Sequence, residues 1–304
     1  MKNKLIRLLL KKSPDWVLEA AKITKKKLRN HSLEQQKKKG GFTKEDLVEG
    51  CKNIGILEGD VLLVHSSLSK IGYVDGGAKT VIETLLQTIG KSGTLLMPSF
   101  PAHGKNKDYL IANKIFDVLN TPSAMGIITE EFRKMPNVKR SLHATDPVCA
   151  LGPDAEFLTA THFGRLTPYD EFSPFRKLIE KKGKILMLGT TLNGAGTSLH
   201  TLEDALDFKY PVYDSKIFDV EIKDKSGETH LTKTKVHNPI YSMKRNCDAL
   251  LPIFLKEKAA IKGKIAEADC IFLDAASMFE TMKKYYNDYG VTMYTPYGDK
   301  NQLA

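Results

Sequence analysis

The feature of this sequence that most limits its fold is a set of short, continuously apolar runs separated by segments of helical length. The runs lie at residues 61–65, 93–98, 184–189 and 270–274. A strand that is apolar on both faces needs cover on both sides of its sheet, and helices supply that cover. The sequence therefore predicts a three-layer α/β/α fold with a mixed, largely parallel central sheet.

Helix and turn signals fall between these runs. Thr43 precedes acidic residues in the manner of a helix N-cap, which predicts a helix to about residue 54. Further helices are expected over about residues 78–89 and from about Ala275 onward. Residues 212–234 alternate polar and apolar side chains around a Lys-Ser-Gly turn, which predicts an antiparallel hairpin at the sheet edge or extending from it.

The charge of the chain is concentrated at its beginning. The net charge is +10, and residues 1–40 hold 13 Lys or Arg and three acids. The remaining residues hold 33 basic and 33 acidic side chains, so they are neutral overall. We therefore expect a basic N-terminal extension over residues 1–41, made of amphipathic helices and a linker, and one folded domain over residues 42–304. Basic amphipathic helices can lie on an anionic membrane surface, pack on the domain or mediate oligomerisation, and the oligomeric state stays open.

Several classes of protein are disfavoured by what the sequence lacks. Its apolar runs are shorter than the roughly 20 residues of a membrane-spanning helix, and its start lacks a signal-peptide cleavage site. A cytoplasmic protein is therefore expected, with peripheral contact at the inner face of the membrane left open. Its four cysteines form no Cys-x-x-Cys pair, which predicts buried, reduced thiols and neither a disulfide framework nor a metal site. Dinucleotide-binding, P-loop, nucleophile-elbow and zincin motifs are also absent.

Two polar segments follow predicted strands and could carry chemistry. Residues 65–77 contain small hydroxyl side chains and glycines, which suit a bound phosphate and are equally typical of a capped turn. Farther along, His200 and Glu203 are three residues apart and would share one face of a helix. A carboxylate beside an imidazole is the arrangement of a general base, although the same pair also occurs on plain surface helices.

The chain contains the blocks HSSLSKIGYVDGG (65–77), GTLLMPSF (93–100), FDVLNTPSAMGIITEEFR (116–133), RSLHATDPVCALG (140–152), FSPFRKL (172–178), GKILMLG (183–189) and TSLHTLE (197–203). From about residue 43 to 280, the sequence resembles the aminoglycoside 3-N-acetyltransferase family in these blocks. Their order and spacing are more specific than one short motif. One departure is Ala144 after His143, where relatives usually have proline, and it puts a loop conformation in doubt.

The resemblance implies a set of site residues. It implies His200 as the catalytic histidine and Glu203 as its acidic neighbour, and we add Thr197 as a candidate for stabilising the oxyanion. The residues implied or expected to bind the coenzyme A co-substrate are His65, Ser66, Ser67, Leu68, Gly72 and Ser173. His162 matches a histidine that some relatives carry and is expected to contact substrate. No metal is implied.

The expected function is that of an acetyl-CoA-dependent N-acetyltransferase acting on an amino group of an amino sugar, with His200 as general base. The basic extension and neutral body favour a role in surface-polysaccharide assembly. The alternative is an aminoglycoside 3-N-acetyltransferase that confers antibiotic resistance. A further alternative is a non-catalytic protein that binds membrane or nucleic acid through its extension, although most lysine runs are simply solvated, and nucleic acid is not an expected partner.

Overall fold

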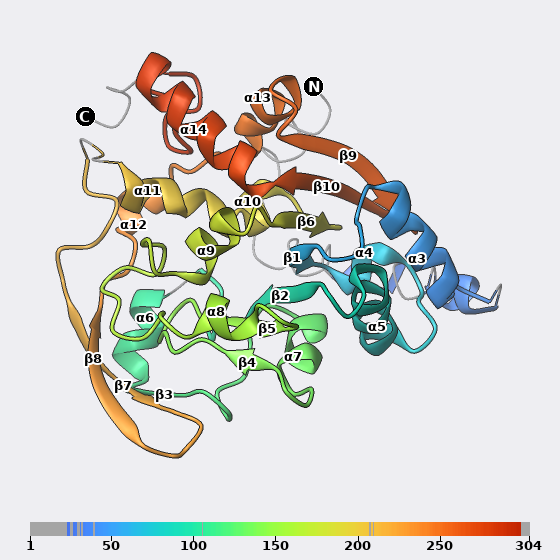
Figure 1. The fold of residues 1–304 in the computed structure, drawn as a ribbon, viewed down its shortest axis with the longest axis horizontal. Helices are drawn as coiled ribbons and strands as arrows, with labels where there is room; N and C mark the ends of the chain where they lie inside the picture. Colours follow the sequence, from blue (N-terminus) through green and yellow to red (C-terminus); the bar gives the residue numbers. More distant parts are fainter. Residues whose placement is uncertain are drawn as a thin grey trace.

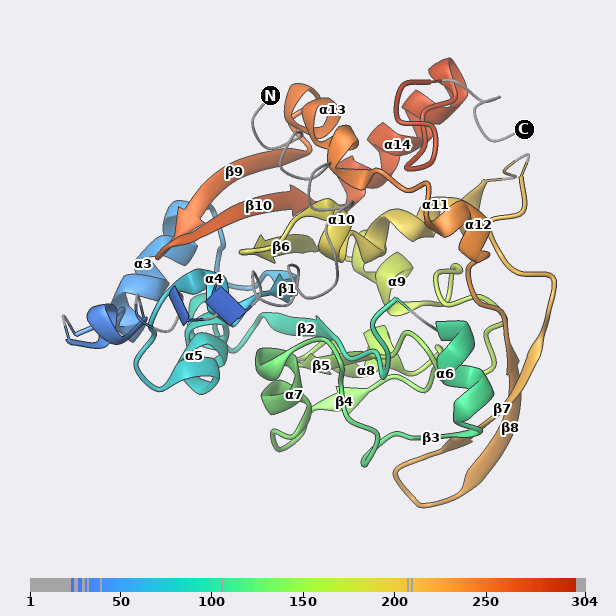
Figure 2. The same ribbon diagram turned by 180° about the vertical axis from the view of Figure 1, so that it is seen from behind.

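The computed structural model describes residues 23–24, 27–28, 31, 33–38, 40–104, 106–206, 208 and 210–298. A seven-stranded sheet runs through the middle of the molecule, and a β-hairpin stands apart from it (Figures 1 and 2). The strands of the main sheet have the order β4 (Lys139–Arg140), β5 (Val148–Leu151), β2 (Thr94–Pro98), β1 (Val61–Ser66), β6 (Lys184–Leu188), β10 (Ala268–Asp274) and β9 (Ala260–Ile265).

The sheet is mixed, as the sequence predicted, but its parallel part is smaller than expected. β1 pairs in parallel with β2 on one side and β6 on the other. The other four pairings, β2 with β5, β5 with β4, β6 with β10 and β10 with β9, are antiparallel. For β9 and β10 the reason is the tight hairpin between them, which has no room for the crossover that a parallel pairing needs.

Helices cover both faces of the sheet, which confirms the three layers. The helices are α3 (Lys44–Asn53), α4 (Leu68–Ile71), α5 (Gly77–Ile89), α6 (Asn106–Ala112), α7 (Ile127–Arg133), α8 (Ala155–Thr159), α9 (Pro174–Glu180), α10 (Leu192–Ala195), the 3₁₀ turn η1 (Thr197–His200), α11 (Thr201–Ala205), α12 (Pro239–Ser242), the 3₁₀ turn η2 (Cys247–Leu250), α13 (Leu251–Lys256) and α14 (Ala275–Tyr289).

Alternate side chains of β1 enter two separate hydrophobic cores. Leu63 packs into the core formed with α8, α9, α13 and α14. Leu62 and Val64 pack into the core formed with α3, α5 and α7. Both faces of the strand therefore exclude water, and this burial is the reason that the run is apolar throughout.

The predicted hairpin is confirmed, but it does not join the main sheet. β7 (Phe218–Lys223) and β8 (Thr229–Thr234) pair antiparallel, and β3 (Ile115–Asp117) pairs in parallel with β7. Together they form a separate three-stranded sheet with its own small core around Phe116, Phe218 and Ile222.

The helix starts predicted after Thr43 and near Ala275 are confirmed. Thr43 caps α3 through a capping box with Asp46, and Asp274 caps α14 by accepting a hydrogen bond from the backbone of Ser277. The four cysteines are buried and unpaired, as expected. None of the described helices combines the length and the apolar composition needed to cross a membrane.

Most of the predicted N-terminal extension lies outside the described residues, so its amphipathic helices, its membrane contact and the domain boundary stay predictions. The described part differs from the predicted linker at one place. Residues 33–38 are helical, and the Gln36 side chain accepts a hydrogen bond from the Tyr73 backbone and donates one to Glu267.

Candidate active site

The candidate site lies beyond the carboxyl ends of β1 and β6, which end side by side with Ser66 opposite Leu188. A cavity of about 1580 Å³ opens there. Its walls include residues from the segments 65–77, 98–108, 124–129, 190–200 and 236–247. Strand ends and the loops that follow them are where open α/β sheets bind ligands, which is the position predicted for the two polar segments.

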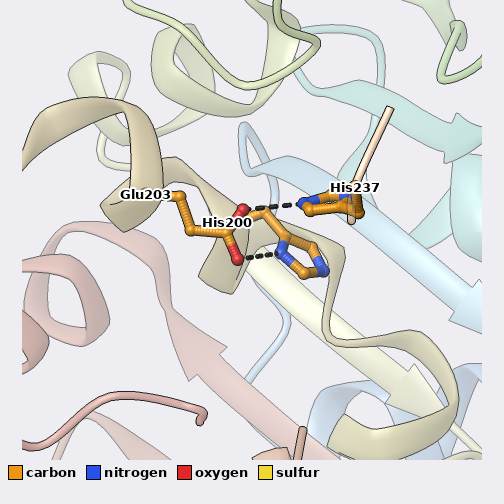
Figure 3. A group of neighbouring side chains, drawn as sticks. All are labelled: His200, Glu203 and His237. Atoms are coloured by element: carbon orange, nitrogen blue, oxygen red, sulfur yellow. Dashed lines mark hydrogen bonds and ion pairs between the residues drawn. The ribbon is translucent and has the colours of Figure 1, made fainter. Parts of the chain in front are cut away.

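Glu203 is the centre of a buried hydrogen-bond cluster (Figure 3). Its Oε1 lies 2.8 Å from His200 Nδ1, and its Oε2 lies 2.7 Å from His237 Nε2. The Tyr294 hydroxyl donates a third hydrogen bond to Oε1, at 2.6 Å. The predicted pair of His200 and Glu203 is therefore close in space and belongs to a larger cluster.

The contacts of His200 fix its tautomer. Arg245 Nη1 lies 2.7 Å from His200 Nε2, and a guanidinium can only donate. Nε2 must then carry the lone pair, so the neutral ring holds its proton on Nδ1 and donates it to Glu203. A ring in this state has its basic nitrogen turned away from the carboxylate, as a general base requires.

The electrostatics of the cluster favour a neutral histidine and an ionised glutamate. Burial lowers the pKa of His200 to about 4, against the opposing effect of Glu203, and His237 and Arg245 lower it further. Burial raises the pKa of Glu203, but the neighbouring imidazoles and their hydrogen bonds outweigh this effect and hold it below its ordinary value. At neutral pH, His200 is therefore uncharged, and its Nε2 lone pair accepts the hydrogen bond from Arg245.

The same three side chains form a set that could hold a metal ion, because their ligand atoms lie within 4.8 Å of one another. In this structure, however, the ring nitrogens contact the carboxylate oxygens directly at hydrogen-bond distance. A zinc site would instead place the ion about 2.0–2.2 Å from each ligand, between them. The geometry matches a hydrogen-bonded cluster, and the expectation that no metal is used stays a prediction.

The loop after β1 forms another part of the cavity wall. Ser66, Ser67, Leu68 and Gly72 all line it, as does His65. Thr197 lies opposite, and its Oγ1 is 3.2 Å from His65 Nε2. The structure thus brings the predicted cofactor loop, Thr197 and His200 to one cavity, with Glu203 behind His200, and contact with coenzyme A stays a prediction.

Comparison with known proteins decides the family. The family profile described as aminoglycoside 3-N-acetyltransferase matches residues 63–287, which is most of the chain. The chain belongs to the aminoglycoside 3-N-acetyltransferase family. The resemblance inferred from the sequence blocks is therefore confirmed.

Relatives within the family are similar at moderate identity. The chain is 33% identical over 164 residues to aminoglycoside N(3)-acetyltransferase IV of Salmonella sp, and the match covers 53% of this chain and 59% of that protein. The chain thus spans about three-fifths of the length of this curated relative. The structure of AAC-IIIb in binary complex with CoASH aligns with a TM-score of 0.68 at 26% identity, covering 81% of this chain and 97% of that one.

The fold is also shared with a more distant structure. Aminoglycoside acetyltransferase AAC(3)-Xa aligns with a TM-score of 0.70 at 24% identity, covering 85% of this chain and 97% of that chain. This likeness bears on the fold alone.

Two residues carried over from the family do not reach the cavity. Ser173 is fully buried and caps α9, where its hydroxyl accepts a hydrogen bond from the Arg176 backbone. Ser173 and Pro174 therefore begin a helix. Pro174 occupies the first helical position, where a backbone N–H would have no partner within the helix. The prediction that Ser173 binds the cofactor by direct contact is not supported by this placement.

His162 also lies in the protein interior, away from the described cavity wall, and its contact with substrate stays a prediction. The residue has no exposed surface. Its Nδ1 lies 2.9 Å from Ser141 Oγ, its Nε2 lies 3.1 Å from the carbonyl oxygen of Pro168, and its ring stacks on His143. Both of its nitrogens have partners within the protein, as a core histidine requires.

Sequence reasoning missed three members of the site: His237, Arg245 and Tyr294. His237 and Tyr294 are 34 and 91 residues from Glu203, and Arg245 is 45 residues from His200. Spacing along the chain cannot pair residues so far apart. The one local signal was the His-Asn-Pro sequence at 237–239, because Asn238 caps α12 and so holds the preceding histidine at a sharp turn.

Proposed function

We propose that this protein transfers an acetyl group from acetyl-CoA to an amino group of an amino sugar, with His200 as the general base. The observation that carries the proposal is the neutral imidazole of His200, oriented by Glu203 in the wall of a large cavity. Membership of the aminoglycoside 3-N-acetyltransferase family supports the reaction class. The structure of AAC-IIIb with CoASH supports coenzyme A as the carrier.

The proposed chemistry needs one group that can accept and return a proton. Free amines are mostly protonated at neutral pH, so the acceptor enters the reaction after losing a proton to water. Its nitrogen bonds to the thioester carbonyl carbon as the carbon–sulfur bond breaks. His200 takes the second amine proton at Nε2 and returns it to the coenzyme A thiolate. Glu203 stabilises the imidazolium through Nδ1, and general base catalysis of this kind contributes about 10²–10⁴-fold.

The remaining predicted residues have supporting roles in this proposal. The loop of Ser66, Ser67, Leu68 and Gly72 would hold the pyrophosphate and pantetheine of coenzyme A, with His65 beside it. Its backbone N–H groups at the end of β1 suit an anion. Thr197 lines the cavity near His200, and its hydroxyl would donate a hydrogen bond to the oxyanion that forms on the carbonyl oxygen.

Two classes of acceptor follow from different observations. The names of the relatives support an aminoglycoside. The cavity wall supports a less cationic amino sugar, because its described acids are Asp108 and Asp146 and its described Lys and Arg residues are Lys107 and Arg245. A polycationic ligand is usually bound by a surplus of acids. The comparisons give no support to a role in surface-polysaccharide assembly.

The test measures free thiol release from acetyl-CoA with both classes of acceptor, for the wild type, His200→Ala and His230→Ala. His230 is the matched control because it lies on β8, away from the described cavity wall. We expect turnover by the wild type and the control, and a loss of at least about 10²-fold in His200→Ala. An unchanged rate in His200→Ala would reject His200 as the base, and the absence of turnover with every amine would reject the reaction.

A further inference from the structure

Arg245 is a cation in the cavity wall that uses a neutral nitrogen as its acceptor. It lies between α12 and η2, and its Nε donates to the carbonyl oxygen of Ser242 at 3.1 Å. Its Nη1 donates to His200 Nε2 at 2.7 Å. The side chain is thus aimed at the nitrogen that the proposed reaction needs.

Unlike Lys107, Arg245 contacts no carboxylate among the residues that the structure describes. Lys107 forms an ion pair with Asp214 at 2.7 Å. Arg245 forms no ion pair with any residue in the described part of the chain. Glu203 lies on the far side of the His200 ring, and its oxygens already accept hydrogen bonds from His200, His237 and Tyr294.

Both hydrogen-bond acceptors of this guanidinium, His200 Nε2 and the Ser242 carbonyl oxygen, are neutral. The guanidinium is partly buried at a cavity that reaches the reacting centre. Charge-assisted hydrogen bonds to a carboxylate or phosphate are about twice as strong as those to a neutral acceptor, and guanidinium geometry favours two of them in parallel. An anion entering the cavity would therefore compete well with His200 Nε2 for Arg245.

One of the two acids in the described cavity wall already accepts hydrogen bonds from the protein. Asp146 accepts hydrogen bonds from the Tyr169 hydroxyl at 2.9 Å and from Asn106 at 3.3 Å. Asp108 is the other carboxylate in the described wall. The region around the base therefore presents a guanidinium whose hydrogen-bond partners are neutral and a carboxylate, that of Asp146, which already accepts two hydrogen bonds.

We infer that Arg245 recognises an anionic group, a phosphate or a carboxylate, on the amine acceptor, and that its transfer from His200 to this group exposes Nε2 to the amine. This inference rests on the proposed function and names the acceptor class. It accounts for a catalytic base whose lone pair is covered in the free protein. Binding of the anionic acceptor therefore exposes Nε2 of His200. When water or a neutral amine enters the cavity, Arg245 still covers this nitrogen.

The experiment compares acceptors that differ only in an anionic group. Hexosamines with the amine at carbon 2, 3 or 4 are tested as free sugars, as sugar 1-phosphates and as nucleoside diphosphate sugars. Kanamycin is tested as a polycationic acceptor. Proteins are the wild type, Arg245→Gln, Arg245→Lys and Lys244→Gln, each checked for thermal stability. Lys244 is the control because it is an exposed neighbouring cation outside the described cavity wall.

We expect the wild type and Lys244→Gln to prefer the anionic member of a pair by about 10–100-fold in kcat/KM, from the strength of a charge-assisted hydrogen bond. Arg245→Gln should lose this preference, Arg245→Lys should keep part of it, and KM for acetyl-CoA should stay within about twofold. In Arg245→Gln the turnover of neutral sugars should fall less than the turnover of anionic sugars, whereas a purely structural role would slow both alike.

The contrary results are separable. Turnover of kanamycin or free hexosamines without a preference for anions would overturn the inference and leave the proposed function standing. A raised KM for acetyl-CoA in Arg245→Gln, with the acceptor preference unchanged, would assign Arg245 to the phosphates of coenzyme A and also overturn it. If the wild type acetylates no amine, the proposed function fails and the inference fails with it.

Discussion

Replacing Glu203 by Gln changes the charge of the cluster centre while keeping its shape. The carboxylate accepts three hydrogen bonds, at 2.8 Å from His200, 2.7 Å from His237 and 2.6 Å from Tyr294. The amide offers one oxygen and one NH₂ group, so at least one of these donors must face another donor. If the NH₂ group faces His200, the ring takes the opposite tautomer, its Nε2 becomes protonated and Arg245 must move away from it.

The expected loss can be worked from these contacts. A wrong tautomer removes the general base, which is worth about 10²–10⁴ in rate, or about 3–5 kcal/mol of transition-state stabilisation. If the amide oxygen faces His200 instead, the base survives, but the imidazolium loses its counter-charge. The free energy of unfolding should fall by about 1–3 kcal/mol, because a buried donor loses its acceptor. The loss is limited because a neutral amide is easier to bury than a carboxylate.

The assay is kcat for thiol release from acetyl-CoA, with urea unfolding measured in parallel. Glu83→Gln is the matched control, since Glu83 is half-exposed and pairs only at the surface with Lys44 and Lys79. We expect kcat to fall by at least about 10²-fold in Glu203→Gln, with little change in KM for acetyl-CoA. Retention of more than about a tenth of wild-type kcat in a folded variant would refute the idea that Glu203 sets the state of His200.

Three other predictions test the structure. Ser173→Ala should cost about 1 kcal/mol in urea unfolding, because it removes the cap of α9, and should leave KM for acetyl-CoA unchanged; a raised KM would restore Ser173 as a cofactor residue. Gly72→Ala should destabilise by about 1–3 kcal/mol and weaken acetyl-CoA binding, because Gly72 has φ +96° and a Cβ there would meet the Phe42 ring at 2.8 Å; wild-type stability would contradict the loop geometry. Burial lowers the pKa of His65 to about 3 and that of His143 and His200 to about 4, so the unfolded chain binds more protons between pH 6.5 and 4. The stability that these histidines contribute is complete above pH 6.5 and is lost as the pH falls towards 4, at up to about 1.4 kcal/mol per pH unit for each, and a flat urea-unfolding profile over this range would refute their neutral burial.

The sequence by itself determined the layers of the fold. Apolar runs such as residues 61–65 have one physical solution, a strand covered on both faces, and the β1 strand is buried along this whole run. Thr43 and Asp274 fixed helix starts because capping depends only on neighbours in the chain. The pair of His200 and Glu203 was also readable, because three residues bring two side chains together on any helical turn.

Only the tertiary structure decided which distant residues meet. Sheet pairing placed the end of β1 beside the end of β6, and with it Thr197 beside His65, 132 residues away. It also brought Tyr294 to Glu203 and Arg245 to His200, contacts that no local spacing encodes. The tertiary structure also places His162 in the interior. The burial of a residue depends on what packs around it, and a local sequence motif does not reveal this. The sequence therefore indicated the base, whereas the structure showed that an arginine covers it.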